Sequence, residues 1–319
     1  MMATATCRSD SMPPVTDIRS RFRHVAARLA GAVVALAMLG HGPAAGADAP
    51  AGAGAGDEGR KAFRVCRDPN NLPFQNARGE GFEDRIAALF AAELGVPVEA
   101  YDYPARFNFI RNTLRFKLPG DDFPCDIVMD VPAGFSQGTA TTRPYYRSTY
   151  ALVIPAASPL AGTASVEAFL ALPQEKLAAL RIGVIDKSPA SNWLAKRGLI
   201  DLGKPYQLLS ADPDKSSQQS VEDDLIAGRL DAAILWGPIA GHFARSHPDA
   251  KLAVLPLQSE RNIKFDYEIA MAVRIADKAW LKTIDGLIAR NQAKIDAILR
   301  DYGVPLLEPL PPAGGGRDD

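Results

Sequence analysis

Residues 125–132 read CDIVMDVP, and after a loop residues 141–154 read TTRPYYRSTYALVI. The first stretch is a short apolar run with β-branched residues that ends at Pro132. This length and composition are typical of an inner strand of a parallel sheet rather than of a helix. The second stretch is a further predicted strand that carries the chain onward. Since ligands of open α/β sheets bind beyond the carboxyl ends of the strands, we expect a site at residues 129–136.

Strand and helix patterns alternate on both sides of this stretch. Before it, the patterns predict strands at 63–66 and 96–103 and helices at 80–94 and 107–116. After it, they predict strands at 181–185, 206–209 and 230–236 and helices at 189–197 and 218–227. Strand–helix alternation is typical of doubly wound sheets, so the sequence predicts two α/β domains.

Two apolar extended runs, 150–154 and 267–273, connect these domains. The helical pattern at 280–300 needs an apolar surface, and we expect it to return to the first domain. Two strands that cross between two α/β lobes form a hinge with a cleft. The predicted first lobe is 62–153 with 267–307, the second lobe is 154–266, and 308–319 is a predicted flexible tail.

The first residues are typical of a secretory signal peptide. Several Arg residues precede an apolar run at 29–39, and small residues end at Ala47, where we expect cleavage. The run is too short for a membrane span, which needs roughly 20 residues. Residues 48–61 form a predicted disordered Ala/Gly linker. We therefore expect a periplasmic protein without stable membrane insertion.

The net charge bears on possible binding partners, and the cysteine content bears on disulfide formation. The net charge is −1, which leaves no electrostatic footprint for nucleic acid. Without the leader, Cys66 and Cys125 remain. An even number of cysteines in an oxidising compartment favours a disulfide, and two buried thiols are the alternative.

Sequence motifs for catalysis are weak. We expect no P-loop, no nucleophile elbow and no dinucleotide-binding fingerprint. Outside the leader, His242 and His247 lack further ligands at zinc spacing. We expect no catalytic residue, no metal and no cofactor, and hence a protein that is not an enzyme.

Polar and aromatic residues follow the predicted strand ends at the expected cleft. The predicted cleft residues are Asp68, Asn70, Asn71, Phe74, Glu80, Phe107, Met129, Val131, Ser136, Thr141, Thr142, Ser188 and Trp236. Ser188 opens a helix whose free N–H groups can bind an anion. The alternatives are turn formation for the Asp and Asn residues, dipole pairing for Glu80 and Glu83, and core packing for the aromatic residues.

Five motifs together carry a family resemblance. They are RVCRDPNNLPF at 64–74, GEGFE at 79–83, CDIVM at 125–129, TTRPYYRSTY at 141–150 and DYGVPLL at 301–307. The chain resembles, over about residues 62–307, the type II periplasmic solute-binding proteins. More narrowly it is similar to the branch encoded with quinoprotein alcohol dehydrogenases, which includes the J proteins of methanol dehydrogenase systems.

This resemblance implies a two-lobe fold and a role beside a pyrroloquinoline-quinone-dependent alcohol or methanol dehydrogenase, with or without its c-type cytochrome. Amino-acid receptors of this fold hold the ligand carboxylate with an Arg in the loop that corresponds to 133–140, and that Arg is absent here. We therefore expect an accessory protein that aids maturation or activation of the dehydrogenase. A transporter receptor for a small polar solute is the alternative, and a dehydratase-like lyase is a third reading.

Overall fold

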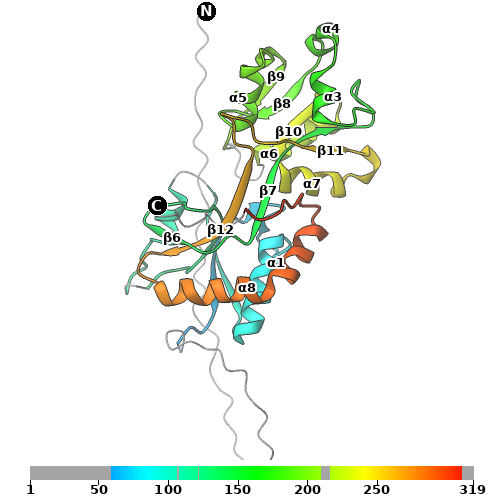
Figure 1. The fold of residues 1–319 in the computed structure, drawn as a ribbon. Coiled ribbons are helices and arrows are strands. Elements are labelled where there is room, and N and C mark those ends of the chain that lie inside the picture. The colour runs from blue at the N-terminus through cyan, green and yellow to red at the C-terminus, as the bar shows by residue number, and fades with distance from the viewer. Residues whose placement is uncertain (1–58, 106–107, 121, 210–215, 311–319) are drawn as a thin grey trace, which may run out of the picture. The chain divides into compact units, whose positions relative to one another are not determined.

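The computed structural model describes residues 59–105, 108–120, 122–209 and 216–310 (Figure 1). The predicted leader, most of the predicted linker and residues 311–319 of the predicted tail lie outside these ranges. Within the described ranges, every helix is too short or too polar to cross a membrane.

The first lobe is built on three strands, β1 (Phe63–Arg67), β4 (Val98–Asp102) and β5 (Val128–Pro132). β1 pairs in parallel with β4, and a parallel bridge between Val65 and Ile127 joins β1 to the start of β5. The smaller elements of this lobe are β2 (Asn70–Asn71), β3 (Gln75–Asn76), α2 (Phe109–Asn112) and β6 (Thr139–Thr141). The predicted helix at 107–116 was too long, because after Asn112 the chain turns to bury Leu114.

The second lobe contains the parallel strands β8 (Ile182–Ile185), β9 (Gly203–Tyr206) and β10 (Ala232–Trp236). Its other elements are α3 (Val166–Leu170), α4 (Gln174–Ala178), α5 (Pro189–Lys196), α6 (Ser217–Ile226), α7 (Gly237–Ser246) and β11 (Ala253–Pro256). The strand predicted at 206–209 was wrong, since β9 ends at Tyr206. β9 is an edge strand, where Pro205 is tolerated because its missing N–H faces away from the sheet.

Two long strands, β7 (Tyr146–Ile154) and β12 (Asp266–Arg274), run between the two sets of elements (Figure 1). Residues 146–149 of β7 pair with residues 266–269 of β12, and the rest of β7 lies between β10 and β11. The two predicted crossing strands are therefore confirmed. Because β12 runs antiparallel to β5, the sheet around β5 is mixed, whereas the sequence predicted a purely parallel one.

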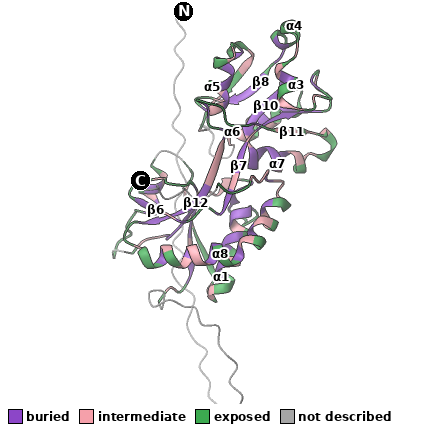
Figure 2. Ribbon diagram, viewed as in Figure 1, coloured by how far each residue is buried: buried purple, intermediate pink, exposed green. Residues whose placement is uncertain are grey.

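The long helix α8 (Lys278–Asp301) packs on the first lobe. Its Trp280 lies against Phe63 of β1, with ring centroids 5.5 Å apart, and Phe63 also contacts Phe90 of α1 (Phe82–Leu94) at 6.1 Å. The side of α8 toward α1 is buried along its length, while the opposite side is exposed (Figure 2). This one-sided burial explains the helical spacing of its apolar residues.

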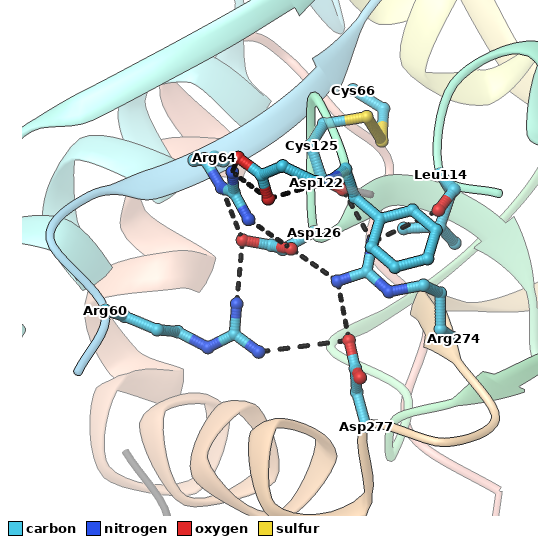
Figure 3. Close-up of polar contacts among 10 residues, drawn as sticks. Arg60, Arg64, Cys66, Leu114, Asp122, Cys125, Asp126, Arg274 and Asp277 are labelled. Atoms are coloured by element: carbon cyan, nitrogen blue, oxygen red, sulfur yellow. Dashed lines mark hydrogen bonds and ion pairs between the residues drawn. A yellow bond between two sulfur atoms is a disulfide. The ribbon is translucent and has the colours of Figure 1, made fainter. Parts of the chain in front are cut away.

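A disulfide and a buried cluster of ion-paired side chains hold the segment that precedes β5 (Figure 3). Cys66 and Cys125 form the predicted disulfide. The next side chain, Asp126, is 1% exposed and accepts hydrogen bonds from Arg64 (2.8 Å) and from Arg274. Burial alone would raise the pKa of Asp126, but these hydrogen bonds outweigh it and hold the pKa below its usual value.

Candidate functional site

Four polar side chains from four different elements meet near the end of β5, and we call them the acidic cluster. They are Gln75 of β3, Glu83 of α1, Asp130 of β5 and Tyr146 of β7. The Gln75 amide donates a hydrogen bond to Glu83, and Glu83 interacts electrostatically with Asp130. Tyr146 in turn interacts with both carboxyl groups.

Local backbone contacts bring Gln75 and Glu83 together. The N–H of Glu83 donates to the carbonyl of Phe74 at 2.9 Å, so the start of α1 lies directly against the β3 segment. A Cβ atom at Gly81 would lie 1.9 Å from the same carbonyl oxygen, so this approach requires glycine. The glycine at the helix start therefore positions the buried carboxylate.

The acidic cluster leaves three oxygen atoms without hydrogen-bond partners: Oε1 of Gln75, Oε1 of Glu83 and the hydroxyl of Tyr146. Their side chains are deeply buried, with exposed fractions of 5%, 1% and 6% respectively. The indole of Trp236 lies close enough to lower the pKa of the Tyr146 hydroxyl slightly, although it does not form a regular hydrogen bond. Buried polar atoms are nearly always paired, so three unpaired atoms in one cluster are unusual.

Burial also changes the acidity of both carboxyl groups. The pKa of Glu83 is raised well above its usual value by burial first and then by the charge of Asp130. Desolvation raises the pKa of Asp130 to about 7, although the residue as a whole is only half-buried. Carboxyl groups whose pKa is raised by burial and by a specific charged partner are typical of functional sites. The pair can hold a proton at neutral pH or bind a cation.

Tyrosine side chains line the same region. The Tyr145 hydroxyl donates to the carbonyl of Met129 at 2.9 Å, and its ring lies 4.9 Å from that of Tyr146. Burial and then the nearby carboxyl groups raise the pKa of both hydroxyls well above the usual value. Both tyrosines therefore stay neutral at physiological pH. Among the described residues, no group of three or more His, Cys, Asp or Glu side chains is placed to hold a metal.

The predicted site residues after β1 mainly shape the chain. Asp68 accepts hydrogen bonds from the N–H groups of Asn70 and Ala105, each at 3.0 Å. Asn70 and Asn71 form β2, which pairs with β3. Glu80 is exposed and pairs with Arg78 at 2.6 Å.

Three predicted site residues are packed in the core. Phe74 contacts Phe82 with ring centroids 5.2 Å apart, and Met129 and Val131 are buried in two different hydrophobic clusters. Met129 and Val131 flank Asp130, so the prediction named both neighbours of the acidic residue without naming the residue itself.

The predicted Ser and Thr site residues are exposed or form hydrogen bonds with the backbone. Ser136 is exposed, and Thr141 accepts from the N–H of Gly134 at 3.3 Å. Thr142 is buried and accepts from the N–H of Met271 at 3.0 Å. Ser188 caps the start of α5. Residues 134–138 read GFSQG, which matches the pattern of a nucleophile elbow, but they join β5 to β6 rather than a strand to a helix.

Trp236 is a predicted residue whose side chain lies beside the acidic cluster. It ends β10, its ring packs on Tyr150 (5.4 Å) and Tyr267 (5.8 Å), and its indole lies near the Tyr146 hydroxyl. The remaining predicted residue, Phe107, lies outside the described residues.

Sequence reasoning did not select Asp130, Gln75 or Tyr146, and it assigned Glu83 mainly to the helix dipole. One signal was available for Asp130, because a charged residue inside an otherwise apolar strand needs a partner or a function. No local pattern marks Gln75 or Tyr146, whose proximity to Glu83 depends on packing of segments distant in sequence.

A surface groove of about 1030 Å³ lies beside the start of β7, α8 and the segment 304–310. Its polar groups are largely paired: Arg147 binds Asp266 at 2.7 Å, and Gln292 donates to the carbonyl of Tyr145 at 2.9 Å. Tyr146 of the acidic cluster is also one of the residues that line this groove. We place the candidate site at the acidic cluster, because its buried oxygen atoms are unpaired.

The acidic cluster predicts a specific pH dependence of stability. We expect Asp130 alone to lower the free energy of unfolding by on the order of 2 kcal/mol from pH 5 to pH 8. Asp130 loses its proton near pH 4 in the unfolded chain but near pH 7 in the folded protein, so its contribution is present at low pH and is lost as the pH rises through 7. Urea unfolding at several pH values measures this, and Asp130→Asn should reduce the slope without abolishing it, because the pKa of Glu83 is raised as well.

Glu222 must be considered in the same experiment, because burial also raises its pKa to about 7. Glu222→Gln provides the matched control, since it removes the Glu222 part of the slope and leaves the Asp130 part. Equal slopes for the unmodified protein and Asp130→Asn would contradict the raised pKa of Asp130.

No family model matches the chain, but it is similar to several known proteins. The chain is similar to Protein MoxJ of Paracoccus denitrificans, with 28% identity over 258 residues that cover 77% of this chain and 89% of MoxJ. It is also similar to the crystal structure of the periplasmic binding protein XoxJ from Methylobacterium extorquens AM1, with 31% identity and a TM-score of 0.61. That match covers 77% of this chain and all of XoxJ. MxaJ has the same TM-score at 23% identity and shows the fold alone.

Proposed function

This chain belongs to the periplasmic binding protein family, in the branch of the methanol-oxidation J proteins, and from this premise we propose that it is an accessory protein of a periplasmic quinoprotein alcohol dehydrogenase. It is a two-lobe periplasmic binding protein linked to methanol dehydrogenase systems. The proposed role is to aid maturation or activation of the dehydrogenase by binding it. The leader would direct export and be cleaved near Ala47.

The observation that carries this proposal is the match to XoxJ over the whole of that chain. The charge of the candidate site supports it by making an amino-acid receptor a poor fit. Such a receptor needs a cation for the ligand carboxylate, whereas the acidic cluster presents two carboxyl groups. The nearby Arg143 is exposed, and its backbone N–H is held by Asp285 of α8 at 2.7 Å.

A tagged copy purified from the periplasm of its own cells, grown on an alcohol, tests the proposed partner. We expect a quinoprotein dehydrogenase to co-purify at moderate salt and to be identified by mass spectrometry. A tagged periplasmic protein of another family serves as the control for nonspecific capture. Recovery of the tagged protein without a dehydrogenase, together with normal dehydrogenase activity in cells that lack the chain, would contradict the accessory role.

A transporter receptor is the second candidate, and one observation favours it. The unpaired buried oxygen atoms of the acidic cluster lie beside the crossing strand β7, where a ligand could influence the two lobes. Co-purification with a permease and its ATPase in place of a dehydrogenase would support this candidate.

A further inference from the structure

The acidic cluster has acceptor atoms that the protein itself does not satisfy. Oε1 of Gln75, Oε1 of Glu83 and the Tyr146 hydroxyl are buried without partners. A buried polar group that loses its water and gains no partner destabilises the folded protein. The amide of Gln75 already donates to Glu83, so the cluster has used its own nearby amide donor and still presents free oxygen atoms. Such an arrangement indicates a ligand that brings hydrogen-bond donors.

The charge of the acidic cluster determines which kind of hydrogen-bond donor it can bind. Two carboxyl groups repel an anion, and a neutral alcohol supplies only one O–H donor. A primary ammonium group supplies three N–H donors, a positive charge and no acceptor. We propose that the acidic cluster of Gln75, Glu83, Asp130 and Tyr146 binds the ammonium group of a small organic amine.

The surroundings of the acidic cluster agree with an organic cation. The Tyr146 ring packs edge-on against Phe82, with centroids 6.1 Å apart, and the Trp236 indole lies nearby. Aromatic rings attract ammonium ions through their electron-rich faces. A hard metal ion such as calcium takes six to eight oxygen ligands from several carboxylates. The described residues offer no group of three or more acidic or metal-binding side chains.

Protonation also matches a singly charged ligand. Burial raises the pKa of both carboxyl groups, so at neutral pH the pair carries less negative charge than two ordinary carboxylates. A ligand with one positive charge matches this reduced charge. Binding should displace part of the retained proton, because the ammonium ion favours the fully ionised pair.

This inference goes beyond the proposed role with the dehydrogenase, and it stands if the partner proves to be a different protein. Isothermal titration of the purified full chain at pH 7 with ethylammonium chloride tests it. Ethanol, tetramethylammonium chloride and calcium chloride are titrated in parallel at matched ionic strength. We expect saturable binding of ethylammonium, none of ethanol, and weaker binding of tetramethylammonium, which has no N–H donor.

Variants locate the site. Glu83→Gln and Asp130→Asn should each weaken ethylammonium binding by about tenfold or more, and Tyr146→Phe should weaken it less, since it removes one neutral hydroxyl. Glu99→Gln makes the same charge change at an exposed position on β4 and should leave the affinity unchanged. Circular dichroism confirms that each variant is folded, and Asp130→Asn keeps the test decisive if Glu83→Gln does not fold.

Three results would overturn the inference. They are the absence of binding by ethylammonium, equal binding of ethylammonium by the unmodified protein and Asp130→Asn, and binding of calcium in place of ethylammonium. A failed pull-down of the dehydrogenase would leave these titrations unaffected, so the two proposals fail separately.

Discussion

Replacing Asp126 with Asn is expected to lower the free energy of unfolding by about 3 to 5 kcal/mol. The Asp126 carboxylate is 1% exposed and is shared by three guanidinium groups, those of Arg60 (2.7 Å), Arg64 (2.8 Å) and Arg274. The substitution keeps the size of the side chain but removes its charge. The three cations then lose their shared buried counterion, while Asp277 still pairs with Arg274 at 2.6 Å and Asp122 with Arg64 at 3.1 Å.

Arg274 is the residue most affected by this change. It is 9% exposed, and it also donates to the carbonyl groups of Cys125 (2.7 Å) and Leu114 (3.1 Å) and lies over the ring of Phe123 (4.1 Å). These contacts join the end of β12 to the segment before β5 (Figure 3). Loss of the Asp126 charge therefore weakens the attachment of β12 to the first lobe.

Urea unfolding followed by circular dichroism measures the effect. Glu80→Gln is the matched control, because it removes one carboxylate from an exposed ion pair with Arg78, and it should leave the stability nearly unchanged. A double-mutant cycle with Arg274→Gln should give a coupling of more than about 1 kcal/mol. An Asp126→Asn variant as stable as the unmodified protein would show that the carboxylate is not held as described.

Removal of the disulfide is expected to have a similarly large effect. The double variant Cys66→Ala and Cys125→Ala should lose about 4 kcal/mol, because the bond closes a loop with a sequence separation of 59 and restricts the unfolded chain. Alanine is chosen because both positions are fully buried, where a serine hydroxyl would lack a partner.

Reduction provides the control for this experiment. Dithiothreitol should destabilise the unmodified protein to about the level of the double variant, and it should leave the variant itself unchanged. A loss below about 1 kcal/mol in both cases would contradict the expected effect of this bond on the unfolded chain.

Much of the fold could be predicted because its signals are local. The apolar run at 125–131 and the repeated strand–helix alternation indicated two α/β lobes, and the runs at 150–154 and 267–273 indicated the crossing strands. The predicted ends of the helices and strands were less reliable than their positions in the chain. β9 ends three residues before the predicted strand end, because its extent is set by its register with β8 rather than by its own composition.

The candidate site was only partly predictable. Sequence reasoning selected the carboxyl end of β5 and named Met129 and Val131, which flank Asp130. It selected Glu80, which is an exposed partner of Arg78, whereas Glu83 is the buried carboxylate. Glu80 precedes α1 and Glu83 lies in its first turn, and helical spacing does not show where the helix begins or which of the two carboxylates is buried.

The sequence by itself determined the fold class, the family resemblance and the disulfide, because these depend on local periodicity, motifs and the number of cysteines. Only the tertiary structure decided that Gln75, Glu83, Asp130 and Tyr146 meet and that three of their oxygen atoms are buried without partners. The physical reason is that burial and pKa depend on which distant segments pack together. Side chains from β3, α1, β5 and β7 share one environment only after the sheet has formed.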